Sequence, residues 1–188
     1  MPNPLSNFKD VDLIVVFADL LERALKANGI NDLPVVQLNQ PTQQPRGDAG
    51  VFFSFLFDDH VGWMVSDMEY DPVADDFKFT EAQHMIGSIQ ISVLYPFNPE
   101  IHDPSTRPTA KDVANYLAMK MKSMNYIRFF RAAGLGILRV KNVRQNPFEN
   151  DRDQYEFMPS FDMELTYNRE IGQTVPRIVE ILGTIERV

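Results

Sequence analysis

The chain contains no cysteine among its 188 residues. Disulfide bonds, thiolate metal sites and a cysteine nucleophile are therefore excluded. No apolar run is long enough to cross a bilayer as a helix, so we expect no membrane partner. The only histidines, His60, His84 and His102, are scattered and lack the spacing of metal ligands. We therefore expect no metal and no cofactor.

Basic residues are also few, with 18 Lys and Arg against 26 Asp and Glu, which gives a formal net charge of −8. An acidic protein repels phosphate and is a poor general binder of nucleic acid. The chain is 44% hydrophobic and 11% aromatic, which indicates a folded protein with a sizeable core. We predict a single α+β domain over residues 1–188.

Two segments, residues 88–95 and 155–167, alternate apolar and polar side chains with very few errors. A period of two is typical of a strand with one buried face. The apolar positions are Ile89, Ile91, Val93 and Tyr95 in the first segment, and Tyr155, Phe157, Phe161, Met163, Leu165 and Tyr167 in the second.

Helical spacing predicts a leading helix over residues 5–29, with Ser6 or Asp10 as N-cap and Gly29 as the stop. A second helix is predicted from Pro108 to about Asn125, and Thr106 or Thr109 could cap it. Phe129 and Phe130 are expected to close a short final turn. The prediction is a mainly antiparallel sheet with two principal helices packed on one face.

The remaining strands are predicted from short apolar runs, and the turns from Asp, Asn, Gly and Pro clusters. Expected strands are residues 51–57, 62–70 and 137–144, and residues 33–38 are a short apolar segment. Residues 77–85 are ambiguous, and we expect them to extend the strand that continues to Tyr95. Expected turns or breaks are residues 58–60, 71–76, 146–151 and 171–172, and exposed loops are residues 39–48 and 97–107. Residues 175–188 fit both periods, and their β-branched content favours a strand.

Residues that share a face in each predicted element form the expected core. The set is Phe17, Leu20, Leu21, Phe53, Phe55, Ile89, Ile91, Val93, Leu117, Phe161, Met163 and Leu165.

Few residue sets suggest catalysis. Asp67, Glu69 and Asp71 alternate, which on a strand places three carboxylates on one face, where they could hold a hard cation. They lack the glycine and distal glutamate of a calcium loop, which favours a solvated strand face. The sequence Asp58-Asp59-His60 offers a base candidate, but aspartate is common in turns for geometric reasons alone.

The run from Tyr126 to Arg131 mixes aromatic and basic residues. Such a mixture can mark contacts with single-stranded nucleic acid. Aromatic residues in the core, with arginines near a helix C-terminus, are the interpretation that this acidic chain favours.

The order of elements resembles the neck terminator, or tail-completion, proteins of tailed bacteriophages. The resemblance extends from Phe8 to Tyr167 and rests on three short stretches within this order. These are Gly62-Trp63, Ile89-Gln90-Ile91 and Phe161-Asp162-Met163-Glu164-Leu165.

The resemblance implies a structural virion protein without enzymatic activity, assembled in the host cytoplasm and located at the neck. Such proteins form a ring, typically a hexamer, that caps the tail tube and passes DNA through its channel. Implied partners are further copies of the chain, the tail-tube protein, the sheath as a further candidate, and a neck or head-completion protein. The alternative is a small-molecule-binding or hydrolytic α+β domain with Asp58, Asp59 and His60 at its mouth.

A ring that passes DNA is expected to have a neutral to acidic inner wall, because a basic wall would hold phosphates. A bore lined by Arg139, Lys141 and Arg144 would contradict this. The candidate channel-facing residues are Asp67, Glu69, Asp71, Glu156, Asp162 and Glu164.

Overall fold

A computed structural model describes residues 10–38, 49–96, 107–149 and 155–176. Within these ranges the chain forms one six-stranded sheet and three helices. The sheet has the order β1-β2-β3-β6-β4, and β5 also pairs with β6. The strands are β1 (Val35–Gln37), β2 (Gly50–Asp71), β3 (Asp76–Leu94), β4 (Gly136–Val140), β5 (Arg144–Glu149) and β6 (Tyr155–Pro176).

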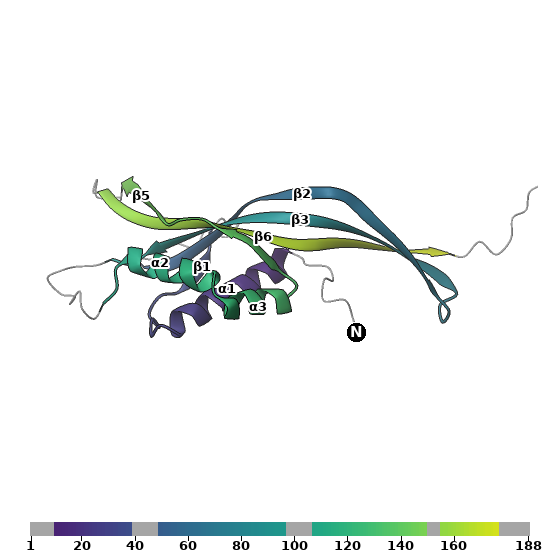
Figure 1. The fold of residues 1–188 in the computed structure, drawn as a ribbon, viewed down its shortest axis with the longest axis horizontal. Helices are drawn as coiled ribbons and strands as arrows, with labels where there is room; N and C mark the ends of the chain where they lie inside the picture. The colour runs from purple at the N-terminus through teal and green to yellow at the C-terminus, as the bar shows by residue number, and fades with distance from the viewer. Residues whose placement is uncertain (1–9, 39–48, 97–106, 150–154, 177–188) are drawn as a thin grey trace, which may run out of the picture.

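The helices all lie on one side of the sheet (Figure 1). They are α1 (Asp10–Lys26), α2 (Ala110–Met121) and α3 (Met124–Ala132). Helix α1 stops where predicted, with Gly29 at a φ of +76°, a conformation that glycine adopts without steric cost. Thr109 caps α2 in a reciprocal capping box with Asp112, which confirms one of the two predicted caps. No helix among the described ranges is both long and apolar enough to span a membrane.

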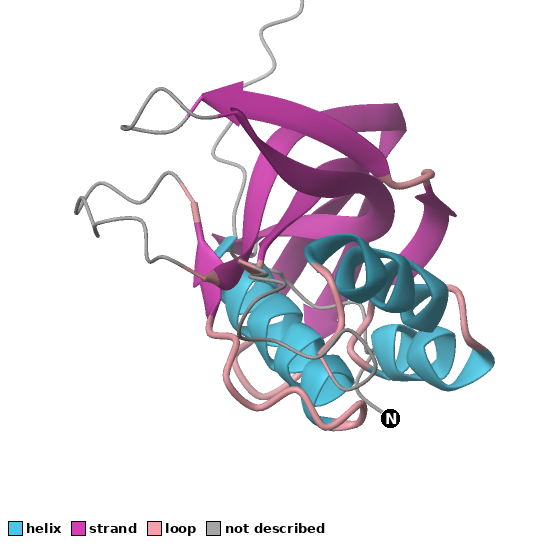
Figure 2. Cartoon of the chain, turned by 90° about the vertical axis from the view of Figure 1, so that its left-hand side faces the viewer, coloured by secondary structure: helices cyan, strands magenta, loops and turns pink. Residues whose placement is uncertain are grey.

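The core lies between the helices and the covered half of the sheet (Figure 2). Phe17 contacts both Phe53 and Phe130, with ring centroids 5.6 and 6.0 Å apart, so it joins α1 to β2 and α3. All the predicted core residues are buried except Phe55, which is half-buried and packs against the cluster. The predicted register is therefore confirmed for residues 88–95 and 161–167, whereas Phe157, predicted on the same buried face, is 60% exposed.

The predicted hairpin turn at residues 58–60 is wrong. Strand β2 runs without interruption from Gly50 to Asp71, and the chain reverses at residues 72–75. Two irregularities in the β2–β3 pairing replace the expected turn, one between Phe55 and Phe57 and one between Val61 and Val65. A bulge accommodates extra residues without ending the strand, so aspartates and a glycine here do not mark a reversal.

Four smaller predictions also fail. Strand β6 continues through Ile171-Gly172 to Pro176, because β3 pairs with it along this whole length. Residues 144–149 form a strand rather than a turn, and Pro147 is tolerated because β5 pairs on one side only. The strand predicted over 137–144 is two strands, since β4 ends at Val140. Phe129 and Phe130 belong to a third helix, α3, rather than to a final turn.

Several predictions fall wholly or partly outside the described residues. They are the start of the leading helix before Asp10, the loops at 39–48 and 97–106, the end of the turn at 146–151, and residues 177–188.

Candidate functional site

Three strands continue well beyond the helices as an extended arm (Figure 1). We define the arm as residues 56–84 of β2, its turn and β3, with residues 168–176 of β6. Every residue from Leu56 to Asp75 is exposed. A sheet without a covering layer leaves both faces accessible, so the arm is the most open part of the described structure.

The bulge near Phe55 decides which side chains share a face of the arm. Phe55 pairs with Ile89 on the helix-side face, whereas Phe57 pairs with Ser88 on the opposite face. Odd-numbered residues of β2 therefore change faces at this point, because an extra residue shifts the period-two pattern by one. Beyond the bulge, even-numbered residues such as Met68 lie on the helix-side face.

An apolar group occupies the helix-side face of the arm, which continues the face that forms the core. Met68 pairs with Phe79, Tyr70 with Phe77, and Glu81 with Ile171. The rings of Tyr70 and Phe77 are 5.3 Å apart. We call Met68, Tyr70, Phe77, Phe79 and Ile171 the apolar arm face.

The predicted row of carboxylates Asp67, Glu69 and Asp71 lies on the opposite face of the arm, paired with Thr80, Lys78 and Asp76. Asp71 accepts hydrogen bonds from the backbone N–H groups of Val73 and Ala74, at 2.9 and 3.3 Å. It therefore stabilises the turn at the arm's tip. No group of three acidic or histidine side chains suited to a metal occurs among the described residues.

The remaining acidic candidates lie where β6 meets β4 and β5. Asp162 is only 7% exposed, and both its oxygens accept hydrogen bonds from Arg144 Nη2 at 2.8 Å. Lys141 Nζ lies 3.0 Å from Glu164 and 3.9 Å from Asp162. Asp162 and Glu164, two of the predicted acidic wall residues, thus pair with Arg144 and Lys141, two of the bases whose presence along the bore would contradict that prediction. The side chain of Glu156 lies outside the described residues.

The candidate base Asp58 sits at the base of the arm rather than in a hairpin turn. Arg169 Nη2 donates to its Oδ2 at 3.3 Å. Burial, reinforced by this nearby carboxylate, raises the pKa of the Tyr167 hydroxyl to about 12. Asp58 and His60 share the helix-side face, and Asp59 points to the other. The trio Asp58, Asp59 and His60 therefore does not converge on one point.

Neither of the other histidines joins a catalytic group in the described chain. His84 Nδ1 lies 2.8 Å from Asn168 Oδ1 on the exposed face of the arm. His102 lies outside the described residues.

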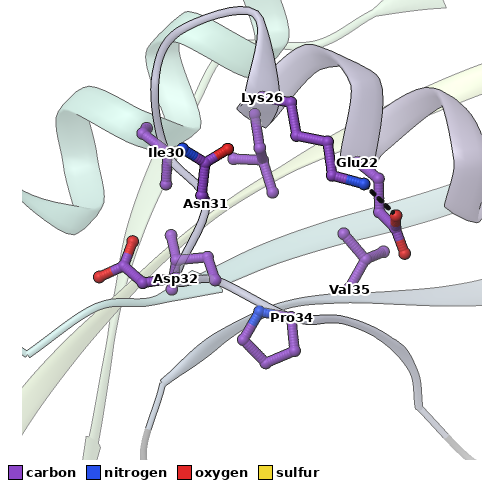
Figure 3. A pocket seen from close by; sticks show the side chains of 9 residues that line it. Glu22, Lys26, Ile30, Asn31, Asp32, Pro34 and Val35 are labelled. Carbon is purple, nitrogen blue, oxygen red and sulfur yellow. Dashed lines mark hydrogen bonds and ion pairs between the residues drawn. The ribbon is translucent and has the colours of Figure 1, made fainter.

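A pocket of about 350 Å³ lies between the end of α1 and the segment that leads into β1 (Figure 3). Its charged groups include Glu22 and Lys26, which pair with each other at 2.9 Å, and Asp32, which accepts from the Tyr95 hydroxyl at 2.9 Å. These charges satisfy one another, so the pocket gives no arrangement of nucleophile, base and orienting group.

The sequence is similar to one family of known proteins. Residues 12–177 match the family described as E217 gateway protein gp29. Among solved structures, the chain is similar to the sheath/tube terminator of an extracellular contractile injection system, PVC, in the extended state, determined by cryo-EM. That similarity has 12% sequence identity and a TM-score of 0.49, and it covers 98% of this chain and 65% of the terminator's length. No curated protein matches the chain.

Proposed function

The chain belongs to the family of the phage E217 gateway protein gp29, and we propose that it is a structural tail-terminator and neck protein that works as a ring. The ring caps the tail tube, joins the tail to the neck and lets DNA pass through its channel. A hexamer is the proposed stoichiometry. The proposed neighbours are the tail-tube protein, the sheath and a neck or head-completion protein, with the ring assembled in the host cytoplasm.

The extended arm is the observation that carries this proposal. It exposes large apolar side chains on a sheet that no described helix covers, including Trp63, which is 95% exposed. Contiguous exposed apolar surface on a soluble chain is typical of a protein–protein contact. A subunit that must bind copies of itself in a ring needs such a surface, whereas a solitary binding domain does not.

The proposal includes no catalysis. The alternative of a hydrolytic domain depends on Asp58, Asp59 and His60 meeting at the mouth of a pocket. Asp58 instead pairs with Arg169, and the described pocket is lined by other residues, between Glu22 and Val35. The geometry therefore favours a protein that acts through contact.

We also propose that the channel wall is neutral to acidic. Among the six candidates, Asp67, Glu69 and Asp71 are exposed on one face of the arm. Asp162 and Glu164, together with Lys141 and Arg144, would present a nearly neutral surface. Either arrangement avoids a deep binding minimum for DNA phosphates.

Electron microscopy of the purified protein tests the ring. We expect closed particles with a central hole and a mass several times 21.6 kDa. A protein that stays at 21.6 kDa at every concentration, in solution and when mixed with tail tubes, would contradict the proposal. A reconstruction of the ring would also test the wall, which fails if Arg139 and other bases line the bore.

A further inference from the structure

Both long edges of the arm are open in the described part of the chain. Strand β1 pairs with β2 only at residues 51–53, and β4 pairs with β6 only as far as Thr166. Beyond those residues, β2 and β6 each pair with the central strand β3 on one side and with no described strand on the other (Figure 1). An unpaired strand edge presents backbone N–H and C=O groups that a strand of another chain can bind.

The backbone groups that face outward on β6 follow from one contact in the body of the protein. The Lys141 N–H donates to the carbonyl of Asp162 at 2.8 Å, so the backbone of Asp162 faces away from β3. Backbone groups alternate between the two sides of a strand, and β6 pairs with β3 in one continuous register from Ser160 to Pro176. The backbone of Gly172, an even number of residues beyond Asp162, therefore also faces outward.

The same alternation identifies the outward groups on β2. Met68 pairs with Phe79, whose backbone faces β6, so the Met68 N–H points away from β3. In the single chain this N–H donates to Asp67 Oδ1 at 2.9 Å. Ser66, two positions earlier, has the same orientation, and β2 pairs with β3 in one continuous register from Val65 to Asp71.

These two edges lack the residues that usually protect a free strand. Residues 65–71 of β2 and 167–175 of β6 contain no proline and no lysine. Proline and lysine are the common means of preventing an exposed edge from pairing with another chain. Both edges of the arm are therefore suited to receive a further strand.

Charge distinguishes the two edges and indicates which strand each receives. Residues 56–71 of β2 contain five Asp or Glu and no Lys or Arg, whereas residues 167–176 of β6 contain one of each sign. Two β2 edges brought together would place Asp67 and Glu69 opposite the carboxylates of another copy, which is unfavourable. A contact between two β6 edges would leave β2 unpaired. Pairing β2 with the β6 of another copy avoids the repulsion and uses both edges.

We propose that the outer edge of β2 in one copy pairs with the outer edge of β6 in the next copy. The inference rests on the proposed ring, because two different edges make a head-to-tail contact, which closes into a ring when the rotation between copies permits. Within one arm, β2 and β6 are both antiparallel to β3 and therefore run in the same direction. Copies related by rotation about an axis along the arms keep this direction, so the new pairs are parallel.

Repeated around the ring, this pairing joins the arms into a closed barrel, which leaves no free edge. A hexamer would contribute about 18 strands, and barrels of this size enclose an aqueous channel. The helices lie on one face of the sheet and need the space outside the barrel. The opposite face, which carries Asp67, Glu69 and Asp71, would then line the bore. The pairing therefore gives the proposed acidic wall a structural basis.

Proline at an outward position tests the β2 edge, because proline lacks an N–H and is tolerated where that group faces away from the partner strand. Ser66→Pro should leave the pairing with β3 intact and shift the particles in light scattering from the ring to 21.6 kDa. Ser66→Ala is the matched control, because it keeps the N–H and should form rings. Circular dichroism and thermal unfolding would establish that both variants are folded.

The β6 edge offers an equivalent pair of variants. Gly172→Pro removes an outward N–H and should also give single subunits. Gly172→Ala should assemble normally, because a Cβ atom there would meet nothing within 4 Å. Each proline variant retains one intact edge, so an equimolar mixture of Ser66→Pro and Gly172→Pro should form dimers and no rings.

Disulfide crosslinking identifies the partner of each edge, because the chain has no cysteine of its own. Asp67 and Gly172 both pair with Thr80 and so lie on the same face, separated by β3 within one copy. Oxidation of a variant that combines Asp67→Cys with either Glu170→Cys or Gly172→Cys should give a ladder of multimers on a denaturing gel. Each single cysteine variant should remain a monomer there. Dimers of Asp67→Cys alone would show that two β2 edges pair, which overturns the inference.

The proline variants give two further outcomes that overturn it. These are normal assembly of Ser66→Pro and a mixture of the two proline variants that stays monomeric. Rings of Ser66→Pro that no longer cap tail tubes would assign the β2 edge to a tail protein instead. Wild-type rings in any of these cases leave the proposed function intact, whereas a monomeric wild type rejects both.

Discussion

At the residue scale, burial of large apolar side chains determines how the body of the protein holds together. Phe161 is fully buried on β6, at a position where it faces the helices. Phe157 lies on the same strand and is 60% exposed. Phe161 and Phe157 therefore differ in burial. Replacing each by alanine measures how much the burial of a phenylalanine stabilises the core.

Replacing Phe161 by alanine should lower the free energy of unfolding by about 3–5 kcal/mol, because the substitution leaves a cavity that the core cannot fully close. Phe157→Ala should change it by less than about 0.5 kcal/mol if its exposed side chain makes no specific contact. Urea unfolding followed by circular dichroism measures both. Equal effects in the two variants would show that the burial assigned to Phe161 is wrong.

Tyr167 should make stability sensitive to alkaline pH. Its folded pKa is about 12, whereas the unfolded value is about 10, so folding favours the neutral phenol. This contribution is fully present below pH 10 and is lost as the pH rises from about 10 towards 12. The free energy of unfolding of Tyr167→Phe should fall less steeply over that interval. Tyr95 and Tyr126, whose pKa values are also raised, are common to both proteins.

At the element scale, the arm requires that β2, β3 and β6 all extend beyond the helices. Gly87 on the central strand β3 pairs with Asp58 on β2 and with Leu165 on β6. A Cβ atom at Gly87 would lie 2.9 Å from Asp58 Oδ1 and 3.2 Å from the Tyr167 ring. The absence of a side chain here therefore lets the strands and the Asp58–Arg169 ion pair pack closely.

Gly87→Ala should destabilise the protein by about 1–3 kcal/mol, the range typical of overpacking. Gly172→Ala is the control, because a Cβ atom there would meet nothing within 4 Å. Thermal unfolding compares the two. If both substitutions prove equally mild, the base of the arm has more room than the structure indicates.

At the scale of the whole molecule, charge is segregated along the chain. The net charge of −8 combines an acidic arm with a basic segment over residues 107–144. An acidic region and a basic region attract each other, which favours association in a defined orientation. This attraction weakens as the ionic strength rises. The acidic residues outnumber the basic ones in the chain as a whole.

The assembled protein should therefore bind duplex DNA only weakly at physiological salt. Fluorescence anisotropy with labelled duplex measures this binding. Tight binding by the wild-type ring, lost steeply as salt rises, would indicate phosphate contacts along the bore and contradict the neutral to acidic wall.

The sequence by itself determined the body of the fold. Alternation over residues 88–95 and 155–167, the spacing in α1 and the cap at Thr109 are local signals, and each was sufficient to predict its element. The predicted core residues followed from the same periodicity, because they share one face in each element. The predicted channel-facing residues stay a prediction, because their role depends on neighbouring copies.

Only the tertiary structure determined that β2, β3 and β6 extend as an arm. Asp58, Asp59 and Gly62 look locally like a turn, but pairing with β3 along its whole length keeps β2 extended through two bulges. The first bulge changes which side chains face the helices, and no local pattern reveals it. The pairing of Asp162 with Arg144 likewise depends on β5 lying beside β6. These features arise from contacts between residues far apart in sequence, which periodicity within a short segment cannot predict.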